Sequence, residues 1–292
     1  MDDRELVVGL VLGVGVENDA AAFHGTPCNG GGHEQYESFA PAAAPDERPH
    51  PALSTDLTTL ENVNPSHSRS NHVVVIGQRA GQAAAAATFL GGPGVTLLGC
   101  VESVRQKTSV LEELRGLPVE VGHLRLASGP EDALRPDDVC GDDVAGADVL
   151  LVGMDIPPET ARAAMYYTRG KVILDPTPAA GQPPAAQHIE ALAPFVHVMV
   201  PDALTVAALD VANPFDAEIY QQAGDLAERL RVNVVVPPGP AEEAGDCFRG
   251  VLALLLAEKT PLPEAVRIAV RAASVATITG KLPARSETLS AS

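Results

Sequence analysis

The chain has 292 residues and a hydrophobic fraction of 46%, enough for a sizeable core in one large domain or two small ones. Only 3% of the residues are aromatic, so the core must consist mainly of Ala, Val and Leu, which favours a parallel α/β sheet over a β-sandwich. The formal net charge of −18 excludes nucleic acid and anionic lipid surfaces as main partners, because it would repel both.

Residues 1–71 are predicted to be a mostly disordered N-terminal segment, because residues 17–72 are rich in Gly, Pro, Ser, Asn and His. The apolar run Leu6–Val16 is a weak candidate for a strand of the main sheet. It is too short to span a membrane and wrongly flanked for a signal peptide, so we expect a cytoplasmic protein. The four cysteines are widely spaced and form no metal-ligand cluster, which also favours a reducing compartment.

From residue 72 onward, short apolar runs alternate with helical stretches. The runs predict strands at His72–Ile76, Val95–Gly99, Val149–Gly153, Lys171–Asp175, Val196–Val200 and Asn233–Val236. Helices are predicted at Gln78–Leu90, Val110–Leu114, Pro158–Arg169, Ala203–Asp210, Ala217–Arg231, Asp246–Glu258 and Leu262–Thr279. Such a βα repeat predicts an α/β fold with a doubly wound, mostly parallel sheet and helices on both faces. Ligands bind these sheets beyond the carboxyl ends of the strands.

The segment Glu243–Asp246 carries the most informative chemical pattern. An Ala-Gly step delivers Asp246 onto the predicted first turn of a buried helix, where main-chain N–H groups and a carboxylate would converge. Unpaired amides at a helix start can hold a phosphoryl group, and the carboxylate can take the proton of an attacking hydroxyl. The alternative is that Asp246 only caps the helix.

Six motifs in a fixed order resemble the ribokinase family of sugar kinases, also called the phosphofructokinase B family. The segment Gly77–Val101 is similar to the family's Gly-Gly-Lys-Gly-Ala-Asn-Gln-Ala signature, and Glu243–Glu258 is similar to its Gly-Ala-Gly-Asp helix. The other four similar segments are Ala147–Ala164, Lys171–Ala179, Val198–Leu209 and Pro261–Thr279. The resemblance covers most of residues 72–289 and implies a kinase domain over residues 72–292.

By this resemblance, the chain would use ATP and Mg²⁺ to phosphorylate a sugar hydroxyl, with ribose or a related pentose as the first guess. A monovalent cation is a further candidate cofactor, and a homodimer is a candidate assembly. The resemblance makes Asp246 the base, with Ala244 and Gly245 supplying anion-hole amides. The substrate-binding positions are Gly77, Gln82 and Asp155. The nucleotide-binding positions are Asp202, Thr205 and Val270, of which Asp202 would also serve the metal.

Several positions depart from the family pattern. Glu243 replaces the first Gly of the helix motif, Thr205 replaces the acid of the magnesium element, and Val270 replaces an Asn. The β segment that carries a Thr-x-Gly phosphate contact is absent between Val236 and Pro240. Ordinary structural roles also exist for the polar candidates: Gln82 as a solvent-facing helix residue, Asp155 as a helix N-terminal charge and Asp202 as a cap.

Two other functions therefore stay open. One is a catalytically impaired protein that keeps the ribokinase scaffold as a binding or regulatory module. The other is an FAD- or NAD-binding oxidoreductase, because Val73–Ala87 also resembles a dinucleotide-binding strand-turn-helix. In that pattern Arg79 and Gln82 occupy the second and third glycine positions, which disfavours it.

Overall fold

The computed structural model describes residues 71–78, 80–91, 94–127, 133–139, 141–177, 185–209, 219–238 and 242–290. All of these residues belong to one compact unit. The predicted disordered segment, with the candidate strand Leu6–Val16, lies outside the described residues except for Asn71, so that assignment stays a prediction.

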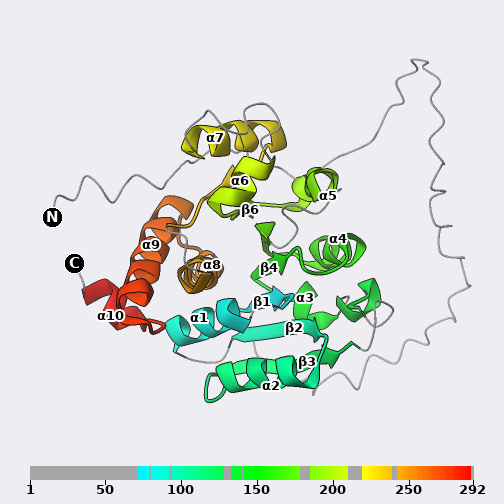
Figure 1. Cartoon of the computed structure of the whole chain (residues 1–292), viewed down its shortest axis with the longest axis vertical. Coiled ribbons are helices and arrows are strands. Elements are labelled where there is room, and N and C mark those ends of the chain that lie inside the picture. The colour runs from blue at the N-terminus through cyan, green and yellow to red at the C-terminus, as the bar shows by residue number, and fades with distance from the viewer. Residues whose placement is uncertain are drawn as a thin grey trace, which may run out of the picture. The chain divides into compact units, whose positions relative to one another are not determined.

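A seven-stranded parallel sheet forms the centre of the fold, in the order β3-β2-β1-β4-β5-β6-β7 (Figure 1). The strands are β1 (Val73–Ile76), β2 (Val95–Val101), β3 (Val119–Leu126), β4 (Val149–Gly153), β5 (Lys171–Asp175), β6 (Val198–Met199) and β7 (Asn233–Val234). The strand order reverses between β1 and β4, and in such sheets the crevice outside the carboxyl ends of these two strands is a preferred ligand site.

Helices cover both faces of the sheet, as the sequence predicts (Figure 1). The cover consists of α1 (Ala80–Leu90), α2 (Val104–Glu113), η2 (Pro136–Val139), α3 (Asp142–Ala145), α4 (Pro158–Tyr167), α5 (Ala185–Leu192), η4 (Ala193–Phe195), α6 (Ala203–Leu209), α7 (Ile219–Leu230), α8 (Glu242–Ala257), α9 (Leu262–Thr279) and α10 (Arg285–Ser290). The fold is therefore the predicted doubly wound α/β architecture.

The two hydrophobic cores follow from the alternation of side chains along the strands. In β1, Val73 and Val75 join the core that contains α1, α8 and α9, whereas Val74 and Ile76 join the core that contains α4, α6 and α7. The strands are apolar on both sides because both faces are covered by helices. The Ala-rich segment of α1 allows α8 to pack closely against it.

At Gly250, α8 lies close against α1. A Cβ atom at this position would lie 2.2 Å from the main-chain oxygen of Gln82 and 2.9 Å from Cβ of Ala85. Only glycine fits between the two helices here. Because Asp246 lies one turn before Gly250 on the same side of α8, this contact also brings Asp246 opposite the start of α1.

Several observed elements differ from the predicted ones. Strand β3 was not predicted, α2 begins at Val104 rather than Val110, and α8 begins at Glu242 rather than Asp246. The early start of α2 has a local cause, since Ser103 accepts a hydrogen bond from the main-chain N–H of Gln106 and caps the helix. Helix α5 was also not predicted.

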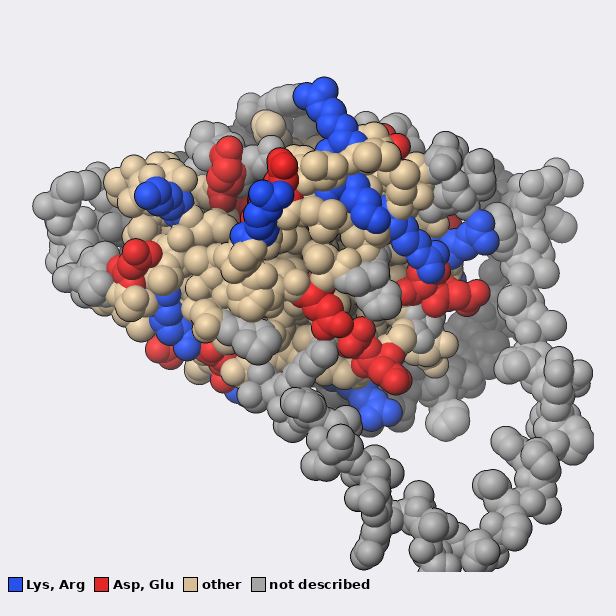
Figure 2. Space-filling model, turned by 90° about the horizontal axis from the view of Figure 1, so that it is seen from below, with Lys and Arg blue, Asp and Glu red and all other residues tan. Residues whose placement is uncertain are grey.

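Charged side chains of both signs are interspersed with uncharged surface on the face shown in Figure 2. Within the described part of the chain, every helix is too short or too polar to cross a membrane.

Candidate functional site

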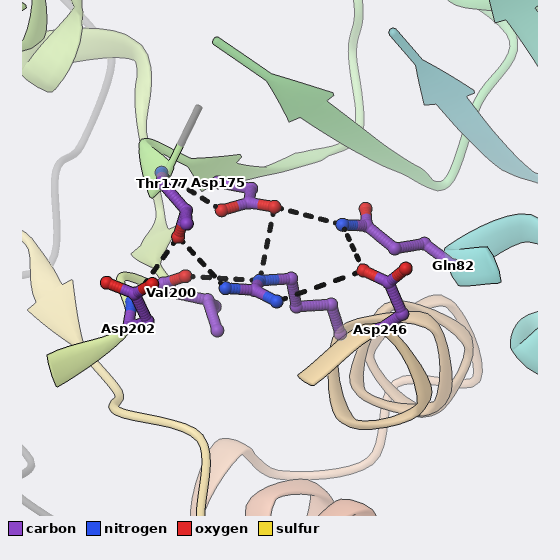
Figure 3. Close-up of polar contacts among 7 residues, drawn as sticks. Gln82, Asp175, Thr177, Val200, Asp202 and Asp246 are labelled. Atoms are coloured by element: carbon purple, nitrogen blue, oxygen red, sulfur yellow. Dashed lines mark hydrogen bonds and ion pairs between the residues drawn. The ribbon is translucent and has the colours of Figure 1, made fainter. Parts of the chain in front are cut away.

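Two carboxylates from distant segments meet at the carboxyl end of the sheet through the side chain of Gln82 (Figure 3). Gln82 Nε2 donates to Asp175 Oδ2 over 2.9 Å and to Asp246 Oδ1 over 3.1 Å. Gln82 comes from α1, Asp175 ends β5, and Asp246 lies in α8. The side chains of Gln82 and Asp175 are fully buried, so the contact between these two forms away from water, whereas Asp246 is partly exposed.

The solvent-facing interpretation of Gln82 is therefore wrong, because its exposed fraction is 0%. Its amide also has an unused acceptor: Oε1 is buried and has no hydrogen-bond partner among the residues described. A buried carbonyl oxygen without a donor is costly, and such atoms are expected where a ligand supplies the missing hydrogen.

Arg249 completes this polar cluster. Its Nε lies 3.2 Å from Asp175 Oδ2, and its Nη1 lies 3.9 Å from Asp246 Oδ1. Nη2 donates to Thr177 Oγ1 over 3.1 Å, and Nε also donates to the main-chain oxygen of Val200. The guanidinium thus joins the ends of β5 and β6 to the first turns of α8.

Asp175 and Arg249 were not predicted as site residues. Asp175 follows an uninterrupted apolar run in β5 at the sheet end where ligands bind, which is one signal that could have identified it. Arg249 interrupts an otherwise apolar stretch of α8, three residues after Asp246. A buried Arg at that spacing from an acid suggests an ion pair.

Asp246 is not the cap of α8, because the helix begins at Glu242. The capping alternative is therefore wrong. In an α-helix only the first N–H groups lack an intrahelical acceptor, and in α8 Ala244 is the last residue with such a group. The amides that could hold an anion therefore lie closer to the N-terminus than predicted. Gly245 and Asp246 fall outside that set, because their N–H groups face carbonyl oxygens of the preceding turn.

Two glycines leave room for the polar side chains of the site. A Cβ atom on Gly81 would lie 2.6 Å from Asp246 Oδ2, and one on Gly245 would lie 2.8 Å from Arg249 Nη1. The Asp246 carboxylate therefore rests against the first turn of α1, and the guanidinium of Arg249 lies over Gly245.

Gly77 and Asp155 lie together at the crevice between β1 and β4. Gly77 adopts a φ of +120°, and a Cβ atom there would meet Asp155 Oδ1 at 2.3 Å. Asp155 Oδ2 accepts a hydrogen bond from the main-chain N–H of Gln78 over 2.8 Å. Asp155 thus fixes the turn that leads into α1, and its predicted contact with substrate stays a prediction.

Asp202 caps α6, as the structural alternative predicted. Its Oδ1 accepts a hydrogen bond from the N–H of Thr205 over 2.7 Å, and its own N–H donates to Thr177 Oγ1 over 3.4 Å. Thr205 is fully buried, and its Oγ1 has no hydrogen-bond partner in the described segments. Through Thr177, the start of α6 is connected to Arg249.

Val270 occupies a different environment from the other predicted residues. It lies in α9, half-buried against the core formed with α1 and α8. Its side chain contributes to packing, and its predicted place beside a nucleotide stays a prediction. Among the described residues, no three His, Cys, Asp or Glu side chains gather as a metal site.

Cys247, next to Asp246 in α8, is buried on the core side of the helix. Burial and, to a smaller extent, the charge of Asp246 raise the pKa of its thiol to about 12. The thiol is therefore neutral at physiological pH and takes no part as a nucleophile.

Known proteins are similar to this chain in sequence and in fold. Ribokinase from Bacillus subtilis (strain 168) is 26% identical over 284 residues, covering 81% of this chain and 95% of that protein. The structure of Arabidopsis thaliana ribokinase complexed with ribose and ATP matches with a TM-score of 0.59 and 18% identity, over 76% of this chain and 98% of that one. Adenosine kinase from Schistosoma mansoni in complex with tubercidin matches with a TM-score of 0.58 and 12% identity, over 72% and 81% of the two chains.

No family model matches the chain. The sequence match nevertheless extends over nearly the whole length of the Bacillus subtilis enzyme, and the parallel sheet with its helices is shared with the two solved kinases. These similarities in sequence and in fold support the ribokinase family of carbohydrate kinases.

Proposed function

We propose that this protein transfers the γ-phosphoryl group of ATP to a hydroxyl of a sugar or nucleoside, with ribose or a related pentose as the first substrate to test. The observation that carries the proposal is the Asp246 carboxylate, held by Gln82 at the carboxyl end of the sheet. The relatives support this chemistry, since they are a ribokinase bound to ribose and ATP and an adenosine kinase.

Asp246 would act as the general base. Its carboxylate accepts the proton of the acceptor hydroxyl as the oxygen attacks the γ-phosphorus, the bond from that phosphorus to the bridging oxygen breaks, and ADP leaves. The hydrogen bond from Gln82 fixes the orientation of the carboxylate before substrate binds. The side chain of Asp246 is 18% exposed, which leaves it accessible to an acceptor.

The amides of the first turn of α8, including that of Ala244, would stabilise the charge on the phosphoryl oxygens. Mg²⁺ would neutralise phosphate charge, held by Asp202 and by the phosphates themselves. Mg²⁺ sites in kinases use only one or two protein carboxylates, and phosphates and water supply the other ligands. The carboxylate of Asp202 with the hydroxyl of Thr205 nearby is therefore compatible with Mg²⁺. A monovalent cation and a homodimeric assembly remain part of this proposal.

A catalytically impaired binding protein is the second candidate. The observation that favours it is Thr205, which stands where the family pattern has an acid and whose buried Oγ1 has no hydrogen-bond partner in the described segments. An FAD- or NAD-binding enzyme is the third candidate, and the purified protein would then be yellow or carry bound nicotinamide.

A coupled ADP-release assay across pentoses, hexoses and adenosine tests the proposed function. We expect ADP release that requires Mg²⁺ and rises with one acceptor class above the ATP-only control. Thermal unfolding with ATP–Mg²⁺ separates the impaired protein from the enzyme: nucleotide at a hundred times its Kd stabilises the fold by about 2.7 kcal/mol even without turnover. The absence of both ADP release and a nucleotide-dependent shift in stability would contradict the proposal.

A further inference from the structure

Arg249 is a buried cation in the middle of the proposed site. Its side chain is only 6% exposed, and Asp175, with which it pairs, is fully buried. Removing an arginine from water is costly, and the cost is met only where charged partners and hydrogen bonds compensate it. The position of Arg249 therefore reflects a specific arrangement and not a surface side chain that happens to fold back.

The donors of this guanidinium are unequally used. Nε and Nη2 are engaged, by Asp175, the main-chain oxygen of Val200 and Thr177. Nη1 makes no hydrogen bond to any residue that the structure describes, and it approaches Asp246 Oδ1 only to 3.9 Å. An arginine carries two N–H donors on each terminal nitrogen, so Nη1 keeps donor capacity inside the site.

The location of Nη1 indicates which ligand could use these donors. It lies over Gly245, next to the carboxylate that would receive the acceptor's proton, and a Cβ atom on Gly245 would be 2.8 Å from it. Gln82 Oε1, buried without a partner among the described residues, belongs to the same cluster. A ligand that uses the donors of Nη1 must offer oxygen acceptors to it.

The charges of the cluster also favour a phosphate ligand at Arg249. Asp175 and Asp246 contribute two negative charges and Arg249 one positive charge, so the cluster without Arg249 would repel a triphosphate. The chain as a whole carries −18, which also disfavours the approach of a triphosphate. A fixed cation at the reacting end of the nucleotide would offset this repulsion.

We propose that Arg249 is a phosphoryl-contacting residue whose Nη1 donates to the γ-phosphoryl group as it passes from ATP to the acceptor. This inference rests on the proposed kinase function. Arg249 gives up no proton: the acceptor's proton goes to Asp246, the new P–O bond forms to the acceptor oxygen, and the bridging P–O bond breaks to release ADP. Planar guanidinium donors suit phosphate oxygens in this geometry.

The competing explanation is that Arg249 only compensates the buried charge of Asp175. A neutral pair separates the two explanations, because Asp175→Asn with Arg249→Gln removes both charges together and leaves neither one uncompensated. Arg249→Lys is the second variant: it keeps a positive charge for Asp175 but loses the Nη1 donors. Arg115→Gln, in an exposed ion pair with Glu112, is the control for loss of an arginine.

Two readouts are measured on the full chain: kcat and KM in the ADP-release assay, and calorimetric binding of inorganic tripolyphosphate. We expect the double variant to fold and to lose about a hundredfold in kcat, with the sugar KM within about threefold of wild type. Tripolyphosphate should bind at least about tenfold more weakly to this variant. Arg249→Lys should show the same direction of change, and Arg115→Gln should match wild type.

Retention of wild-type kcat and tripolyphosphate affinity, within about twofold, by the double variant or by Arg249→Lys would overturn the inference. The binding readout also distinguishes the two proposals. If no acceptor is phosphorylated but tripolyphosphate binds in an Arg249-dependent manner, the kinase function fails, and only the contact of Arg249 with phosphate oxygens is supported. If wild type fails to bind tripolyphosphate, the inference falls whatever the kinase assay gives.

Discussion

Gln82 and Asp246 are 164 positions apart in the chain, and the side-chain amide of the first donates to the carboxylate of the second over 3.1 Å. This hydrogen bond depends on the close packing of α1 against α8 at Gly250. A local helix contact thus determines where the proposed base lies and which way its oxygen atoms face.

Replacing Gln82 with Leu should therefore affect both stability and turnover. The substitution removes hydrogen bonds to two carboxylates and leaves Asp175 and Asp246 with fewer donors, so we expect a loss of about 3 kcal/mol in the free energy of unfolding. The measurement is urea unfolding together with the ADP-release assay. Gln221→Leu, at an exposed position of α7, is the matched control and should change the free energy by under about 0.5 kcal/mol. Equal stabilities of the two variants would contradict the role of Gln82.

Gly250→Ala tests the approach of the two helices. The new methyl group would overlap the main-chain oxygen of Gln82, so α8 must move away from α1 at a cost of about 2 kcal/mol or more. Thermal and urea unfolding measure this cost. Gly141→Ala is the comparison, because a Cβ atom there meets nothing within 4 Å, and its effect should stay under about 1 kcal/mol as a change of helix cap. A Gly250→Ala protein as stable as wild type would show that the helices are not held so closely.

Because the thiol of Cys247 is buried, we expect the stability of the fold to depend on pH. In the unfolded chain its thiol loses a proton near pH 9.0, whereas burial keeps it protonated in the folded protein up to about pH 12. Between these values the unfolded chain binds fewer protons, so the free energy of unfolding falls as pH rises. The contribution of this group is at most about 1.4 kcal/mol per pH unit.

Urea unfolding of wild type and Cys247→Ala at pH 8, 9 and 10 isolates the contribution of the thiol, because all other groups titrate in both proteins. The difference in unfolding free energy should be constant below about pH 9 and should shrink above it. Parallel curves across this range would show that the thiol is not protected from ionisation.

A substitution at Glu243 tests whether negative charge at the start of α8 weakens nucleotide binding. Its side chain is exposed in the first turn of α8, close in sequence to the amides that would hold phosphate. Glu243→Gln should tighten ATP–Mg²⁺ binding by about two- to threefold at low salt, and the gain should vanish near 1 M salt, where exposed charges are screened. Calorimetry at two ionic strengths measures this change. Weaker binding by the variant would contradict the predicted repulsion.

Much of the fold could be predicted because its elements have clear boundaries. Strands β4 and β5 begin and end where the apolar runs predict, and α9 extends between Pro261 and Gly280, which adopts the left-handed conformation of a helix end. Strand β3 was not predicted because Gly122, His123 and Arg125 interrupt its apolar pattern. Its place beside β2 depends on pairing that sequence periodicity does not encode.

The candidate site was predicted only in part. The resemblance placed Asp246 and Gln82, which the structure joins directly. It gave no indication of Arg249 or Asp175, because their pairing depends on the distance between α8 and the end of β5. The start of α8 was also misplaced, since Glu242 and Glu243 suit the first turn of a helix as well as Asp246 does.

The most direct test of the whole account is the rate of ADP release by Asp246→Asn, compared with wild type and with Asp225→Asn at an exposed position of α7. Asn is isosteric with Asp and keeps an acceptor for Gln82, but it cannot take a proton from the acceptor. We expect the Asp246→Asn protein to fold with the thermal stability of wild type to within a few degrees and to lose phosphorylation by at least about a hundredfold, with Asp225→Asn unchanged. Full phosphorylation by the Asp246→Asn protein would contradict the account.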